Sequence, residues 1–539
     1  MRSRAIIPPV FQSIYHWFFP KESASLAHHS IARMLFLRGL GVIYLIAILS
    51  WWVQVHLLVG ENGLVPASSF LAQIDGQVGF FDYPTLFRIT GASDLAIHFT
   101  CAIGCILAIS LIAGFFPGPA LAGLWILYLS FLNTGSVFMS FQWDILLLET
   151  GFLAIWFAPW RLLSLGWKTP VPLGTSHRVV LIFFWVLIAK LMFFSGWVKL
   201  AWAGPNYPEW SPNHTAMSFH YFTQPLPTWT AWWAHQLPEG IQKFSLWPMY
   251  LVELVLPFFI FLGPRCRQIA AIGFTGLMVL ISLTGNYTYF NWLTIVLCIP
   301  LIPDRFWPRR IFEKLKISFH EPTLLVRRTN PVGSKIGWVG FGIRTLPLLV
   351  IALLNFQSVF SDLRNAPNPV TTIDFTPEVL DSFSQKVGGW HLVSGYGLFR
   401  TMTTTRPEII VEGSRDGQLW TAYDFKWKTD RFDEKPRFVA PHQPRVAWQL
   451  WFAALEQGYS PRGRNAGWIS NLVMKLLKGD EAVQVLFYEN PFPNTPPKYI
   501  RMRQFDYEFT TREERRKSGD WWKRYRARNF LSPVSLRSN

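Results

Sequence analysis

The sequence predicts a polytopic α-helical membrane bundle of about nine spans, followed by an α+β, strand-rich extracytoplasmic C-terminal domain. Long apolar runs recur between residues 34 and 357, whereas residues 358–539 have the mixed composition of a soluble domain. Only 15% of the 539 residues are charged, against about a quarter in soluble domains. Lys and Arg also collect in alternate loops, as they do in membrane proteins of fixed orientation.

Nine apolar segments have the length, or nearly the length, needed to cross a bilayer core of about 30 Å. They are 34–59, 94–116, 120–141, 145–159, 179–198, 248–263, 268–285, 289–303 and 338–357. The fourth, sixth and eighth are short, so the number of spans could differ by one or two. The first segment starts too late and is too long for a cleavable signal peptide, and we expect it to remain as a signal anchor.

Loop charge predicts the orientation of the bundle. If residues 1–33 are cytoplasmic, the inside segments carry 17 Lys and Arg, whereas the outside loops carry only Arg88, Lys199 and Lys243. The positive-inside rule favours this orientation. Nine spans then place the C-terminal domain in the periplasm or the ER lumen. The net charge of +17 follows from this topology, so we expect the bilayer, and not nucleic acid, as a partner.

All four cysteines, at positions 101, 105, 266 and 298, lie in or beside predicted spans. The outer domain therefore contains none and cannot use disulfides. This favours a bacterial inner membrane, with the ER membrane as the eukaryotic alternative.

The C-terminal part divides into a linker at 358–380, an α+β domain at 381–511 and a basic tail at 512–539. Residues 408–428 are expected to form a β-hairpin, and 481–492 and 498–510 two further strands. Helices are expected at 445–457 and 467–478. The apolar positions change parity near Gln504, which predicts a bulge or bend in the last strand.

The loop 199–247 is rich in Trp, Tyr, His and Pro and has almost no net charge. Trp and Tyr favour the membrane–water interface, so this loop is expected on the membrane surface or folded back over the bundle. It could roof a functional cleft or form an interfacial aromatic belt. Its histidines His214, His220 and His235 lack metal-ligand spacing, and we expect neither a metal nor a cofactor.

Ionisable residues within apolar spans are costly and are functional candidates. Glu149, Lys190 and Glu253 are such residues, and pairing inside the bundle would explain them without catalysis. Asp144 and Glu149 lie five residues apart, about 140° around a helix, so they do not form one carboxylate pair. The familiar nucleophile, zinc, phosphate and dinucleotide motifs are missing. Lys199, Glu149 and Lys190 are thus weak catalytic candidates, and a non-enzymatic role is favoured.

The segment FVAPHQPRVAWQLWFAAL, residues 438–455, contains a predicted helix that starts near Pro444. Helical spacing predicts a buried stripe made by Trp448, Trp451, Phe452 and Leu455. Packing does not explain the polar residues His442, Gln443 and Arg445. They could satisfy backbone groups of the linker or face a partner.

Several long strings resemble the lipase maturation factor family. In the membrane part they are RMLFLRGLGVIYLIA (33–47), GENGLVPA (60–67), FQWDILLLETGFLAIWFAP (141–159), SFHYFTQPLPTWTAWWAHQLP (218–238), VELVLPFFIF (252–261) and LTGNYTYFNWLTI (283–295). In the outer domain they are YGLFRTMTTTRPEIIVEGS (396–414), the segment 438–455 and YENPFP (488–493).

The resemblance implies an integral membrane protein, resident in the ER in animals, that assists the folding and assembly of dimeric lipases. Candidate client-binding residues then come from two of the matched strings. They are His442, Gln443, Arg445, His220, Tyr221 and Gln224.

A shorter segment, LMFFSGWVKLAWAGPNYPEW (191–210), resembles the membrane bundle of vitamin K-dependent gamma-carboxylases. In that family a lysine at the position of Lys199 acts as a base. This resemblance implies an alternative function, a membrane enzyme that uses Lys199 together with Glu149 or a loop histidine.

Overall fold

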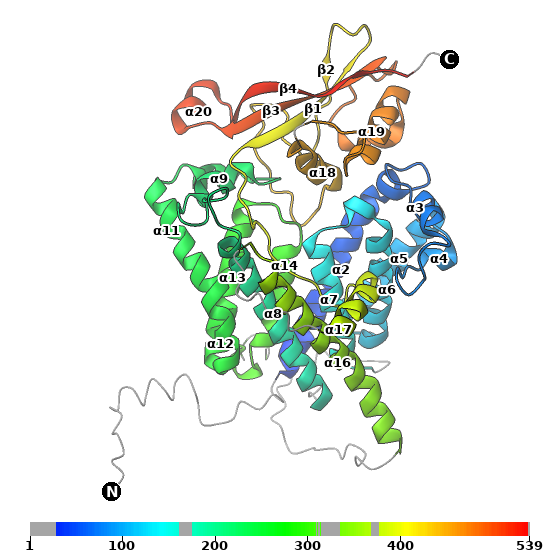
Figure 1. Cartoon of the computed structure of the whole chain (residues 1–539), viewed down its shortest axis with the longest axis vertical. Helices are drawn as coiled ribbons and strands as arrows, with labels where there is room; N and C mark the ends of the chain where they lie inside the picture. The colour runs from blue at the N-terminus through cyan, green and yellow to red at the C-terminus, as the bar shows by residue number, and fades with distance from the viewer. Residues whose placement is uncertain are drawn as a thin grey trace.

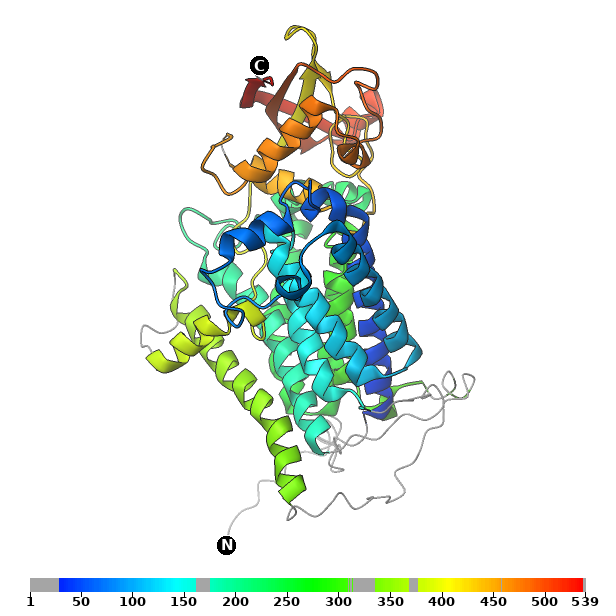
Figure 2. The same ribbon diagram turned by 90° about the vertical axis from the view of Figure 1, so that its right-hand side faces the viewer.

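The chain folds into two layers, a bundle of long helices and a small sheet domain on one end of it (Figure 1). The computed structural model describes residues 29–160, 175–308, 335–367, 377–456 and 458–536, together with positions 310 and 313. The predicted cytoplasmic segment 1–33 therefore lies outside the described residues except for its last five positions. Both views show the sheet above the same end of the bundle (Figures 1 and 2).

The bundle forms where the sequence is continuously apolar. Its elements are α2 (Ser30–Val59), α5 (Asp94–Ala113), α6 (Pro117–Thr134), α7 (Gln142–Phe157), α8 (Thr175–Ala201), α11 (Glu239–Tyr250), a π-helical turn η2 (Leu251–Val255), α12 (Leu256–Leu262), α13 (Pro264–Thr284), α14 (Phe290–Cys298), η3 (Ile299–Leu301) and α16 (Lys335–Arg364). The helix α5 illustrates how the ends of these helices are capped. Ser93 accepts a hydrogen bond from Ala96 N at its start, and Gly114 stops it in the left-handed conformation.

Each predicted span is helical, but the predicted number of nine spans is not confirmed. Within the described residues, six helices are long and apolar enough to cross a membrane: 30–59, 94–113, 177–201, 239–262, 264–284 and 346–364. The helix α7 has 16 residues, which gives about 24 Å at 1.5 Å per residue. The combined helix 290–301 is also short. Apolar composition alone cannot distinguish such short buried helices from full spans, because both are surrounded by apolar side chains.

The sheet domain contains four antiparallel strands in the order β2-β1-β3-β4. The strands are β1 (Arg406–Ser414), β2 (Thr421–Ala422), β3 (Tyr499–Phe509) and β4 (Trp522–Val534). The helices are α17 (Glu378–Lys386), α18 (Arg445–Ala454), α19 (Ala466–Lys478) and α20 (Arg512–Ser518), with 3-10 turns η5 (Gly388–Trp390) and η6 (Glu481–Leu486). The order of strands and helices along the chain resembles the prediction, in which two helices lie between two pairs of strands.

The parity change predicted near Gln504 arises because the sheet is covered on both faces. Ile500 and Met502 belong to the large core shared with α18 and α19, whereas the second half of β3 faces a separate cluster beneath the sheet. The β1–β3 register runs unbroken, but the β3–β4 register shifts between Gln504 and Asp506. The predicted bulge in β3 is therefore wrong, because at this step two residues of β3 span three residues of β4 and the extra residue belongs to β4.

Three predictions for the outer domain need correction. Residues 481–492 do not form a strand, because the Asp480 side chain accepts a hydrogen bond from Ala482 N and starts the turn η6. The second strand of the hairpin is only two residues long. The basic segment 512–539, predicted as a tail, contains α20 and the edge strand β4, in which Trp522 and Phe530 are buried despite the many charged neighbours.

Residues 60–93, predicted as an outside loop, and the loop 199–247 both contain short helices. The first contains α3 (Ala67–Ile74) and α4 (Phe87–Thr90), and the loop 199–247 contains α9 (Ala216–Thr223) and α10 (Trp229–His235). In the predicted linker 358–380, α16 continues to Arg364 and α17 begins at Glu378, and residues 368–376 lie outside the described part.

Candidate functional site

The segment 438–455 lies where the bundle meets the sheet domain. The helix α18 begins directly after Pro444, as predicted. The predicted buried stripe is only half correct, because Phe452 and Leu455 are 39% and 38% exposed. Arg445 turns inward and is completely buried. We refer to the contacts of this segment, and of its neighbours, with the bundle as the domain junction.

Arg445 forms a buried ion pair with Asp144 at the start of α7. Its two terminal nitrogens lie 3.1 and 3.0 Å from the two carboxylate oxygens. The hydroxyls of Tyr128 and Tyr289 donate to Asp144 Oδ1 at 2.5 and 2.7 Å, and Arg445 also donates to the carbonyl of Phe138. Every oxygen of the carboxylate is thus paired, which is the condition under which a buried charge is tolerated.

The positions of α7 and α18 explain why a carboxylate is favoured at position 144. Both α7 and α18 begin at the junction, and Asp144 and Arg445 lie in their first turns. A helix N-terminus carries partial positive charge, so the Asp144 carboxylate offsets two such ends as well as the guanidinium. Burial acts to lower the pKa of Arg445, but the Asp144 carboxylate outweighs it and raises that pKa above its usual value.

His442 and Gln443, which precede Pro444 at the start of α18, join the sheet domain to the outer part of α2. The hydroxyl of Ser50 accepts a hydrogen bond from Gln443 N at 2.9 Å and lies 3.0 Å from His442 Nδ1. Gln54 Nε2 donates to the carbonyl of Gln443 at 2.8 Å, and Trp143 Nε1 donates to its side-chain oxygen at 2.9 Å. The polar cluster that packing did not explain therefore binds the bundle of the same chain.

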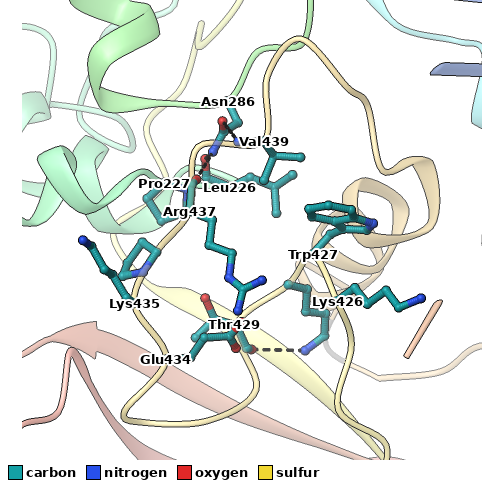
Figure 3. A pocket seen from close by; sticks show the side chains of 12 residues that line it. Leu226, Pro227, Asn286, Lys426, Trp427, Thr429, Glu434, Lys435, Arg437 and Val439 are labelled. Atoms are coloured by element: carbon teal, nitrogen blue, oxygen red, sulfur yellow. Dashed lines mark hydrogen bonds between the residues drawn. The ribbon is translucent and has the colours of Figure 1, made fainter. Parts of the chain in front are cut away.

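Asn286 holds the adjacent chain segment in place (Figure 3). Its amide nitrogen donates to the carbonyls of Leu226 and Arg437 at 2.9 and 2.8 Å, and its oxygen accepts from the backbone nitrogens of Val439 and Ala440 at 2.7 and 2.9 Å. The side chain is 2% exposed. Asn286 belongs to the motif Asn-Tyr-Thr, but its amide is fully used within the folded protein, so it does not present a glycosylation site there.

The aromatic loop 199–247 forms the floor on which the sheet rests. Tyr221 and Trp232 belong to a buried cluster with aromatic residues of β3 and of the start of β4. His220 lies edge-on to Phe399, and burial, followed by the charge of Lys199, lowers the pKa of His220 to about 4. The loop therefore packs between the two layers and is not simply an interfacial belt.

Gln224 connects the same loop to α13 and to the strand β1. Its side-chain nitrogen donates to Thr284 O at 2.7 Å, and Tyr287 donates to its side-chain oxygen at 2.7 Å. Arg406, the first residue of β1, donates to the carbonyls of Phe222 and Pro225 at 2.9 and 3.0 Å, and also to the carbonyl of Gln224. The six predicted partner residues thus all lie at the contact between the layers, and Tyr221, Gln224, Gln443 and Arg445 among them are buried.

Glu149 and Lys190 form a second buried pair, as the pairing interpretation proposed. Lys190 Nζ lies 2.8 Å from Glu149 Oε1 and 2.7 Å from Asn355 Oδ1 on α16. Tyr396 donates to the other Glu149 oxygen at 2.6 Å, and Ser394 N does so at 3.2 Å. This pair joins three helices to the segment that leads into the sheet domain.

Lys199 pairs with Glu253 and not with Glu149. Its ammonium lies 2.9 and 2.7 Å from the two Glu253 oxygens and 2.9 Å from Ser195 O, and it stands 5.3 Å from the ring centre of Trp210. Glu253 lies in the π-helical turn η2, and a Cβ at Gly196 would come within 2.8 Å of Glu253 Cβ. The missing side chain at position 196 therefore allows the close approach. All three donors of Lys199 are engaged, which favours a structural role for it.

Within the part of the chain that the structure describes, no three His, Cys, Asp or Glu side chains are grouped to hold a metal ion. Sequence reasoning missed Ser50, Gln54, Asn286 and the two tyrosines on Asp144. Ser50 and Gln54 have a detectable signal, because they are polar residues four positions apart on one face of a long apolar span.

The fold and the junction define an integral membrane protein whose sheet domain is locked onto one end of a helical bundle. Comparison with protein families matches residues 31–309 to the lipase maturation factor transmembrane domain and residues 392–532 to the lipase maturation factor C-terminal domain. The chain therefore belongs to the lipase maturation factor family.

Relatives with this name cover nearly the whole chain. Lipase maturation factor 2 of Xenopus tropicalis is 32% identical over 95% of this chain and 83% of its own length. The human lipase maturation factor 2 is 32% identical over 95% of this chain and 84% of its own length. Mouse lipase maturation factor 1 is 30% identical over 96% of this chain and 90% of its own length. No solved structure matches the chain.

Proposed function

We propose that this protein is a membrane-bound, chaperone-like maturation factor for secreted or membrane clients, with lipases as the client class. The observation that supports this most strongly is the family match across both layers, which includes both partners of the domain junction. Asp144 lies in the matched membrane part and Arg445 in the matched C-terminal part, so the proposal extends to the assembled unit of bundle and sheet domain.

The sheet domain is proposed to face the ER lumen, where secreted lipases fold. The excess of Lys and Arg in the predicted cytoplasmic segments supports this orientation, and the vertebrate relatives favour the ER over a bacterial inner membrane. The sequence Asn213-His-Thr provides a test, because Asn213 is exposed whereas Asn286 is buried. We expect a glycan on Asn213 after expression in animal cells, sensitive to the Asn213→Gln change, and none on Asn286. Absence of any glycan from an otherwise folded protein would contradict the luminal position.

The client is proposed to bind exposed aromatic side chains around the loop 426–438. Phe432 and Phe438 are 39% and 46% exposed, and the neighbouring Tyr488 is 39% exposed. Exposed aromatic groups of this kind mark interaction surfaces when they gather in one region. The buried residues of the junction are proposed to act indirectly, because they hold this loop against the bundle.

A complementation assay tests the proposal. Cells that lack their own maturation factor are made to express a secreted dimeric lipase with or without this chain, and the activity per mass of secreted lipase is measured. We expect this chain to restore activity, and Phe432→Ser with Phe438→Ser to reduce the restored activity several-fold at unchanged protein level. Leu419→Ser is the control, since Leu419 is 79% exposed on the distant β1–β2 turn. Unchanged lipase activity with and without the chain would contradict the function.

The alternative function, a carboxylase-like enzyme with Lys199 as the base, receives no support from the geometry. A base needs a free lone pair near the substrate, whereas Lys199 is 5% exposed and bonded to Glu253 and Ser195.

A further inference from the structure

An apolar cavity of about 280 Å³ lies between the outer part of α2 and the sheet domain. Its volume is close to the lower limit of about 300 Å³ for small-molecule sites. The lining residues come from α2, the loop after β2, the start of α18 and the turn η6. They are Val53, Gln54, Phe425, Lys426, Trp427, His442, Pro444, Val446, Ala447, Val485 and Leu486.

The cavity has a buried apolar floor and an open rim. Phe425, Val446 and Ala447 are at most 6% exposed, whereas Val53 and Val485 are 64% and 45% exposed. The side chains of Phe425, Val446 and Ala447 offer no hydrogen bond to water, so the floor favours an apolar occupant. The site therefore suits a hydrocarbon group that enters from the rim.

The rim is continuous with the lipid-facing side of α2. Val42, Leu49 and Val53 are 42%, 43% and 64% exposed, and their spacings of seven and four residues place them on one face of the helix. In a membrane this face contacts acyl chains. A chain that follows it outward reaches the cavity where α2 meets the sheet domain.

A cation at the rim provides charge for a headgroup. Lys426 is half-buried, lines the cavity and has no ion pair with another described residue. Trp427 lies beside it, and Figure 3 shows both on the opposite side of the neighbouring small pocket from Lys435. Lys and Trp at the level of the headgroups are the residue types that contact anionic lipids and the interface.

The backbone around the cavity is not free to bind an extended peptide. Lys426 N donates to Leu486 O, and Tyr488 N donates to Asp424 O, so the two walls pair with each other. Gln443 lies between the lining residues His442 and Pro444, and both its backbone nitrogen and its carbonyl are hydrogen-bonded to α2. A peptide that adds to such a surface would leave its own polar groups unpaired, whereas an acyl chain has none.

We propose that this cavity binds one acyl chain of an anionic phospholipid from the leaflet on the side of the sheet domain, with the phosphate near Lys426. The lipid would fill the space between α2 and the sheet domain and so join that domain to the bilayer as well as to the bundle. The inference depends on the membrane location of the bundle and is independent of the client.

Photo-crosslinking of the full chain in lipid nanodiscs tests the proposal. The nanodiscs contain phosphatidylcholine with about a third phosphatidylglycerol, and a trace of either lipid carries a diazirine at the end of one acyl chain. After irradiation, mass spectrometry maps the adducts. We expect adducts on 425–427, 444–447 and 485–486, and about fivefold more with the phosphatidylglycerol probe, as one lysine contact of about 1 kcal/mol predicts.

Variants distinguish lipid bound in the cavity from lipid that only contacts the outer surface of the bundle. Ala447→Trp fills the floor and is expected to reduce these adducts at least tenfold. Val485→Trp closes the rim, is expected to act similarly, and serves if the first variant fails to fold. Gly276→Leu is the control, because Gly276 on α13 is exposed and faces open space, so the cavity adducts should persist. Lys426→Gln is expected to equalise the two lipid probes.

Three results would overturn the proposal. The first is an adduct pattern confined to the lipid-facing part of α2, with none in the cavity. The second is persistence of the cavity adducts in folded Ala447→Trp and Val485→Trp. The third is that a benzophenone amino acid at position 485 captures polypeptide and no lipid, which would assign the cavity to a protein segment. Equal labelling of the wild type by both probes would overturn the role of Lys426.

Discussion

Asp144 and Arg445 lie 301 residues apart in the sequence and form one completely buried ion pair. Asp144 lies in the first turn of a helix of the membrane bundle, and Arg445 is the first residue of a helix of the sheet domain. The pair is shared by two domains that family comparison matches separately. It therefore connects the membrane anchor directly to the outer domain.

Arg445→Met is expected to destabilise the junction by about 3–5 kcal/mol, because it leaves the Asp144 carboxylate buried without its cation. The double variant Arg445→Met with Asp144→Leu should recover much of this loss, since Tyr128 and Tyr289 remain 2.6 Å apart and can bond to each other. Thermal unfolding in detergent measures both. Arg431→Gln is the control, because its ion pair with Asp433 is exposed and should matter little. A double variant no more stable than the single one would contradict the burial argument.

Asn286→Ala is expected to release the segment 437–440 from the bundle, because four hydrogen bonds are lost and several backbone groups remain buried without partners. Limited proteolysis of the full chain should then cut within 426–440 many times faster than in the wild type. Asn213→Ala changes the same residue type at an exposed position, and its cleavage pattern should stay that of the wild type. Equal protection in Asn286→Ala would show that other contacts hold this segment.

Lys199→Met is expected to lower the yield of folded protein, because Glu253 stays buried without its cation. Lys199→Met combined with Glu253→Met removes both charges and should restore folding and lipase maturation together. The complementation assay and thermal unfolding measure the two properties in the same preparations. A double variant that folds normally but does not support maturation would instead indicate chemistry at Lys199.

The pH dependence of stability should include a contribution from His442. Burial, followed by the charge of Arg445, lowers the pKa of His442 to about 4, below its unfolded value of about 6.5. The folded state therefore binds fewer protons, and this contribution is fully present above about pH 6.5 and is lost as the pH falls towards 4. The loss between pH 7 and pH 5 is about 2 kcal/mol. His442→Asn should flatten the decrease in melting temperature over this range, and an unchanged profile would contradict the assignment.

Much of the architecture is local enough to predict from the sequence. Continuous apolar runs indicated where the bundle helices lie, and the parity change near Gln504 reflects the two clusters that cover the two faces of the sheet. The turn η6 and the edge strand β4 were missed for opposite reasons. The first has strand-like composition but is started by Asp480, and the second is masked by charges that pair across the sheet, as Arg528 does with Asp506.

The sequence by itself determined that this is a membrane protein with a separate C-terminal domain, because apolar length and loop charge are properties of single segments. It also contained the strings that identify the family. Only the tertiary structure decided the partner of each buried charge: Asp144 with Arg445, Glu149 with Lys190, and Glu253 with Lys199. Pairing depends on which helix faces approach each other, and that follows from the packing of the whole chain.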